Sequence, residues 1–78
     1  MKVAETISSN ISMIGHESNT LYIQFNSGAV YSYEGVPQAL FDGMATAHSA
    51  GRYFHHNIKG NYSHTKLDYD PFAIQAAA

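Results

Sequence analysis

Hydrophobic and polar residues alternate most clearly over residues 20–25, where apolar side chains fall on one side and polar ones on the other. A period of two is typical of a half-buried β-strand. Residues 10–16 and 29–34 carry weaker forms of this pattern, and turn-forming Glu-Ser-Asn and Asn-Ser-Gly sequences separate the three segments. Short connections join antiparallel neighbours, so the pattern predicts a three-stranded antiparallel meander.

The length of the second hairpin loop decides where Tyr31 and Tyr33 point, because a shift of one residue moves every side chain to the other face. A two-residue loop places both tyrosines on the polar face. A three-residue loop with Gly28 at positive φ pairs Phe25 with Ala29 and places them on the apolar face. The Asn-Ser-Gly order favours the three-residue loop.

After the meander, the apolar residues recur at helical spacing, which predicts an amphipathic helix over residues 37–47. Ser49 is a favourable N-cap for a second helix over residues 49–59. Residues 62–69 are compatible with a short edge strand, and the tail at 75–78 is expected to be frayed. The predicted fold class is α+β, a three-stranded meander followed by two helices that pack on one face.

Composition limits what this chain can be. Its 78 residues and 8.6 kDa allow one small domain over 1–78. The absence of cysteine excludes disulfides, thiolate metal ligands and a cysteine nucleophile. No segment has the apolar length of a secretory leader or membrane span, so we expect no membrane partner and a cytoplasmic protein.

The net charge of −2 conceals a segregation along the chain. Residues 1–42 sum to −3, residues 43–67 sum to +3 without any carboxylate, and the remaining residues sum to −2. Proteins that follow a long phosphate backbone usually present a broad cationic surface. Three cations therefore suit one small phosphate-bearing ligand better than a wrapped nucleic acid.

Three blocks of sequence in a fixed order carry a family resemblance: Ser8-Ser9-Asn10-Ile11, then Phe25-x-x-Gly28-x-x-Tyr31-x-Tyr33-x-x-Val36-Pro37, then Ser49-x-Gly51-Arg52-Tyr53-Phe54 with Ile58-Lys59 and Tyr62. The chain resembles the KTSC domain, which occurs at the C-terminus of some lysyl-tRNA synthetases and as free-standing bacterial and phage proteins. The resemblance implies a core over 8–62, a C-terminal extension over 63–78 and a bacterial setting. It departs at Asn57, where the family pattern implies histidine.

The second predicted helix carries a candidate anion site. Four side chains at spacing i, i+3, i+4 and i+7 share one face of that helix: Arg52, His55, His56 and Lys59. Ser49 and Gly51 lie at its N-terminus, where free N–H groups attract anions and glycine admits a ligand close to the backbone. The alternative is an ordinary solvated face with an ordinary cap.

Tyrosines supply the second part of the candidate site. The candidates to stack on a base are the rings of Tyr22, Tyr31, Tyr33, Tyr53 and Tyr62. Tyrosines also fill the cores of small domains that lack tryptophan, and this alternative applies to Tyr31 and Tyr33 in particular.

Catalysis has little support in the sequence. Residues 43–67 contain no Asp or Glu to orient a histidine base, and no H-x-x-x-H pair or nucleophile motif is present. We therefore expect no catalytic residue, no metal and no cofactor, with cleavage of a phosphodiester by two histidines as the remaining catalytic alternative.

The combined hypothesis is a non-enzymatic module that binds a phosphate-bearing nucleotide or cyclic nucleotide. A shallow pocket on so small a domain favours a homo-oligomer that completes the site. The family resemblance extends this to a phage protein that sequesters a nucleotide immune signal. A module for single-stranded RNA or tRNA is one alternative, and a protein-interaction module without nucleotide affinity is the other.

Overall fold

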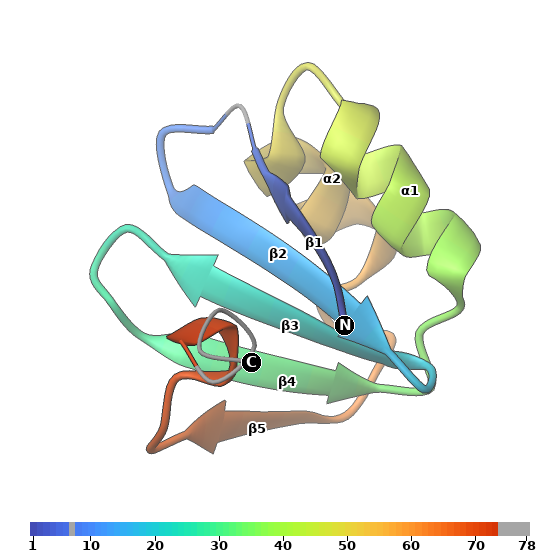
Figure 1. Ribbon diagram of the computed structural model, residues 1–78. Coiled ribbons are helices and arrows are strands. Elements are labelled where there is room, and N and C mark those ends of the chain that lie inside the picture. Colours follow the sequence, from blue (N-terminus) through green and yellow to red (C-terminus); the bar gives the residue numbers. More distant parts are fainter. Residues whose placement is uncertain (7, 74–78) are drawn as a thin grey trace.

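The computed structural model describes residues 1–6 and 8–73 and contains one antiparallel sheet with two helices (Figure 1). The strands run in the order β1-β2-β3-β4-β5 across the sheet. Their bounds are β1 Lys2–Glu5, β2 Ile11–Glu17, β3 Thr20–Phe25, β4 Val30–Glu34 and β5 His64–Leu67; the helices are α1 Gln38–Thr46 and α2 Ala50–Asn57. The α+β class is confirmed, and the expected tail at 75–78 lies outside the described residues.

The predicted three-stranded meander is the centre of a five-stranded sheet. The two additional strands, β1 and β5, each contain four residues and form the sheet edges. β5 falls within the segment expected as a short edge strand. β1 was not predicted, because its Lys-Val-Ala-Glu sequence is too short and too mixed in polarity to carry a periodic signal.

The hairpin between β3 and β4 has the three-residue loop that the sequence favours. The Phe25 amide donates to the Ala29 carbonyl at 2.9 Å, and Gly28 has a φ of 98°. Only glycine adopts this left-handed conformation without steric cost. Tyr31 and Tyr33 accordingly lie on the apolar face of the sheet.

Both helices pack on that same face. Its core contains fully buried aliphatic side chains from the sheet, such as Leu21 and Ile23, together with Met44 of α1. α1 and α2 approach closely because Gly43 has no side chain: a Cβ there would overlap the Tyr53 ring. Gly43 therefore lowers the intrinsic stability of its helix while allowing the two helices to pack together.

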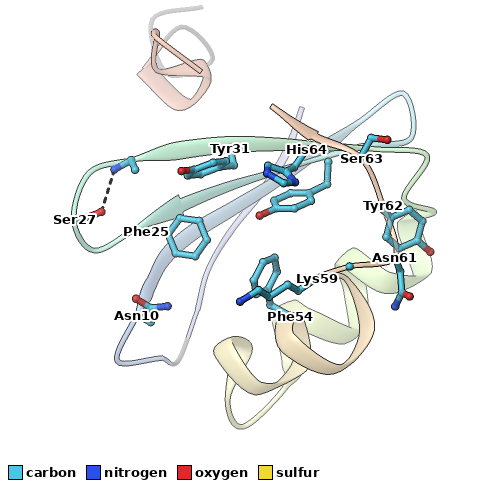
Figure 2. A pocket seen from close by; sticks show the side chains of 13 residues that line it. Asn10, Phe25, Ser27, Tyr31, Phe54, Lys59, Asn61, Tyr62, Ser63 and His64 are labelled. Carbon is cyan, nitrogen blue, oxygen red and sulfur yellow. Dashed lines mark hydrogen bonds between the residues drawn. The ribbon is translucent and has the colours of Figure 1, made fainter. Parts of the chain in front are cut away.

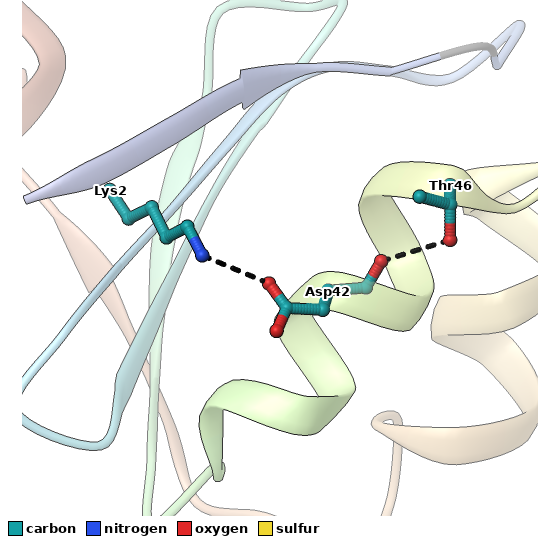
Figure 3. Close-up of polar contacts among 3 residues, drawn as sticks. All are labelled: Lys2, Asp42 and Thr46. Carbon is teal, nitrogen blue, oxygen red and sulfur yellow. Dashed lines mark hydrogen bonds and ion pairs between the residues drawn. The ribbon is translucent and has the colours of Figure 1, made fainter.

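The edge strand β1 is tied to α1 by polar contacts (Figure 3). The Lys2 ammonium lies 3.3 Å from an Asp42 carboxylate oxygen, and the Thr46 hydroxyl donates to the Asp42 carbonyl at 3.0 Å. Both charged side chains are more than half exposed. A solvated pair of this kind contributes little free energy, so it mainly fixes the orientation of the two elements.

The opposite face of the sheet is covered by both ends of the described chain. Met1 and Phe72 lie against Gly15 in the middle of β2. The Asp70 carboxylate accepts from the Phe72 and Ala73 amides and so starts the short C-terminal turn seen in front of the sheet in Figure 1. Among the described residues, no helix is long and apolar enough to cross a membrane.

Candidate functional site

A groove of about 920 Å³ lies between α2 and the β4–β5 part of the sheet (Figure 2). The chain segment that connects α2 to β5 forms one end of it. Six of its lining side chains have rings: Phe25, Tyr31, Tyr33, Phe54, Tyr62 and His64. The sheet supplies one wall and the helix the other, so the groove depends on their packing.

Five of the six rings, all except Tyr62, form a continuous cluster of ring contacts. Phe54 of α2 meets Tyr33 at 5.4 Å and Phe25 at 5.9 Å between ring centroids, both edge to face. His64 meets Tyr31 at 5.9 Å and Tyr33 at 5.8 Å, since β5 pairs Tyr33 with His64. Edge-to-face packing fixes ring positions, which gives the groove a preformed aromatic surface.

Polar groups with free hydrogen-bonding capacity lie along the rim. Lys59 and Asn10 line the groove, and neither side chain has a hydrogen-bond partner among the described residues. The Asn10 backbone is fixed at both ends, because its amide donates to the Ser8 hydroxyl at 3.1 Å and its carbonyl accepts from the Asn26 amide at 2.8 Å. The groove therefore offers both cationic and amide groups to a ligand.

Carboxylates are absent from the described lining of the groove and lie elsewhere. Burial raises the pKa of Tyr22 on the opposite face, and the charges of Tyr69, Glu17 and Glu34 raise it further. This proximity places Glu17 and Glu34 on the side of the sheet away from the groove. No carboxylate of the described lining therefore offsets the charge of Lys59 in the groove.

The Tyr33 hydroxyl is a hydrogen-bond donor within the groove. Burial raises the pKa of Tyr33, and the neighbouring Tyr31 adds to the effect, so the hydroxyl keeps its proton at neutral pH. The ring is only 6% exposed, and its hydroxyl has no protein partner. Among the described residues, every fully buried polar side-chain atom has a hydrogen-bond partner. The Tyr33 hydroxyl has no such partner, so it is not fully buried and is accessible from the groove.

Four of the candidate residues line the groove, namely Tyr31, Tyr33, Lys59 and Tyr62, whereas Tyr22 lies on the opposite face of the sheet. Three others, Arg52, His55 and His56, lie exposed on α2 and are not among its lining residues. The four side chains predicted to share one helix face are divided, because α2 ends at Asn57 and Lys59 lies beyond it. The amides of residues 58 and 59 both donate to the Phe54 carbonyl, so Lys59 leaves the helical path that its spacing assumed.

The remaining predicted residues are engaged within the fold. The Ser49 hydroxyl accepts from the Arg52 amide at 3.2 Å, which confirms it as the N-cap. Gly51 lies against the Ser8 hydroxyl, and Tyr53 covers Gly43. The start of α2 is therefore packed against the segment between β1 and β2 and against α1, apart from the groove.

Three further ring-bearing residues of the groove, Phe25, Phe54 and His64, were not among the candidate site residues of the sequence. His64 enters only through the long-range pairing of β5 with β4. Asn57, at the position of the expected histidine, donates its side-chain amide to the Tyr53 carbonyl at 3.1 Å and stays exposed. Within residues 1–6 and 8–73, no group of three or more His, Asp or Glu side chains is arranged to hold a metal.

Comparison with protein families places this arrangement among known folds. The model of the KTSC domain matches residues 7–62, which is most of the chain. The chain belongs to the KTSC domain family. A crystal structure of a KTSC domain protein from Yersinia pestis superposes with a TM-score of 0.77 at 35% identity, covering 85% of this chain and 96% of that one.

Two curated relatives show the settings in which similar sequences occur. A lysine–tRNA ligase of Trichormus variabilis is 40% identical over 50 residues, which is 64% of this chain and only 9% of the ligase. An uncharacterized protein of Stutzerimonas stutzeri is 34% identical over 71 residues and is matched along 100% of its length. The KTSC domain thus resembles both a small part of a large enzyme and a whole small protein.

Proposed function

We propose that this KTSC domain is a non-enzymatic module that binds a phosphate-bearing nucleotide in the aromatic groove. The observation that carries the proposal is the combination, in one groove, of a ring cluster with Lys59 and no lining carboxylate. A nucleotide presents the complementary pair of groups, a flat base and an anionic phosphate.

The base is assigned to the more open rings of the groove. Tyr31 and Phe25 are half-buried and meet edge to face at 5.7 Å, so part of each ring remains available to a ligand. Stacking of one base on an aromatic side chain is worth about 1–3 kcal/mol. Tyr33 is more deeply buried and orders the wall behind them.

The phosphate is assigned to Lys59, whose side chain extends along the groove in Figure 2. An ammonium is a compact point charge that binds phosphate without requiring a fixed geometry. Lys59 is the one lysine or arginine among the described lining residues, and one such cation suits the phosphate of a single nucleotide. Polymer binding gains its affinity from many phosphate contacts.

Single-stranded RNA is a second candidate, and the similarity to lysine–tRNA ligases favours it. Aromatic platforms beside cationic side chains are common to both ligand classes. The exposed Arg52 would then contact a phosphate beyond the groove. For RNA, affinity increases with strand length and falls steeply with added salt.

Calorimetry with a panel of nucleotides and short RNA oligonucleotides tests the proposal. We expect Lys59→Ala to weaken nucleotide binding by roughly tenfold or more, the loss of one charge-assisted hydrogen bond. Arg52→Ala is the matched control and should bind a single nucleotide like the parent. Absence of heat with every ligand would refute nucleotide and RNA binding together and favour a protein-interaction module.

Binding without turnover suits a protein that withdraws a nucleotide from solution, and we extend the proposal to sequestration of a nucleotide signal in a bacterial or phage-infected cell. We also propose a homo-oligomer, because the groove is open on the surface of one small chain and a second copy would enclose the ligand. Light scattering should then report at least twice the chain mass of 8.6 kDa. A monomeric mass with nucleotide bound would show that one chain forms the complete site.

A further inference from the structure

We propose that His64 of β5 is a phosphate-contacting residue and that the groove prefers a ligand with a terminal phosphate monoester. This inference rests on the proposed nucleotide function and adds the class of phosphate to it. β5 begins at residue 64, beyond the segment 7–62 that matches the family. The strand that carries His64 is therefore outside the part of the chain that the family model describes.

The sheet register determines where His64 lies. Tyr33 pairs with His64 and Tyr31 pairs with Lys66, so all four side chains share the helix-facing side of the sheet. The His64 ring contacts both tyrosine rings, and the residue is exposed and lines the groove. Figure 2 shows it on the sheet wall beside Tyr31.

The ring nitrogens of His64 are available to a ligand. Neither has a hydrogen-bond or ion-pair partner among residues 1–6 and 8–73, in contrast to His16, whose Nε2 lies 2.7 Å from the Val36 carbonyl. Contact with two tyrosine rings restricts the position of the imidazole without occupying its N–H group. The His64 ring therefore has a restricted orientation and an N–H group without a partner among the described residues, as expected of a residue that contacts a ligand.

Charge determines the class of ligand. Lys59 follows the helix wall of the groove and His64 belongs to its sheet wall, whereas Lys66 lines a separate hollow with Asp68 and Asp70. A terminal phosphate monoester carries about −1.5 to −2 charge near neutral pH and has three acceptor oxygens for donors such as the His64 N–H group. A phosphodiester or a cyclic phosphate has one negative charge and fewer free oxygens, and it would satisfy fewer of these donors.

The experiment compares three probes that share one base: a nucleoside, its 5′-monophosphate and its 3′,5′-cyclic monophosphate. For the parent protein we expect the monophosphate to bind at least roughly tenfold more tightly than the cyclic compound, the effect of one additional charge-assisted hydrogen bond. In His64→Phe, which keeps a ring against the tyrosines but removes both ring nitrogens, this preference should largely disappear while affinity for the nucleoside is unchanged. His55→Phe is the matched control, because His55 is exposed on α2 outside the groove.

The outcomes separate the two proposals. If Lys59→Ala weakens binding but His64→Phe keeps the parent preference for the monophosphate, nucleotide binding stands and the role of His64 is wrong. Equal losses for nucleoside and monophosphate in His64→Phe would show that the side chain acts on the base and would also overturn the inference. If the parent binds none of the three probes, both proposals fail.

Discussion

On its inner side, α2 packs Phe54 against the Tyr33 and Phe25 rings and is followed by the fully buried Ile58. On its outer side, His55 and His56 are exposed, and their ring centroids lie 5.9 Å apart. The outer side is the more conspicuous in the sequence, yet the groove lies along the inner one. Periodicity identifies the polar side of a helix, whereas the position of a cavity depends on what packs against the other side.

The inner and outer sides of α2 should differ most in how much they contribute to the stability of the fold. We expect Ile58→Ala to lower the free energy of unfolding by about 2–5 kcal/mol, because the substitution leaves a cavity in the core. His55→Ala on the outer side should change it by less than about 0.5 kcal/mol. Urea denaturation of the two variants measures both values, and similar losses would mean that the outer side also packs against something.

A smaller effect tests how well the inner side excludes water. Burial raises the pKa of Tyr33, so at alkaline pH the unfolded chain loses the phenol proton before the folded chain does. The free energy of unfolding should therefore fall as pH rises above the ordinary value of 10.0 and level off beyond the folded pKa. Tyr33→Phe should reduce this decline in denaturation at several alkaline pH values. An unchanged decline would place the Tyr33 hydroxyl in bulk water in the folded state.

Local pattern predicted much of the fold. The alternation over residues 20–25 and the glycine at 28 determined the meander, the hairpin and the side of the sheet on which Tyr31 lies. These signals are strong because a period of two and a positive φ are each specified within a few residues. β1 was missed because a four-residue edge strand has almost no internal pattern.

The candidate site was less predictable because its walls come from distant parts of the chain. His64 meets Tyr33 through a strand pairing that spans about half of the domain, and no local pattern encodes that register. Lys59 was predicted on the same helix face as Arg52, but helical spacing was extended past the point where α2 ends, and Lys59 lies two residues beyond that end. Ring contacts between sheet and helix then determine which residues share the groove.

The contact of Met1 and Phe72 with Gly15 has a consequence for how this domain can be joined to other proteins. Both ends of the described chain leave from the face opposite the groove, and they leave close together. A neighbouring domain attached at either end, or a host loop that carries the domain as an insertion, would leave the mouth of the groove unobstructed. The same arrangement makes the two ends suitable for a short covalent linker, with new ends opened in the exposed turn at Ser18-Asn19.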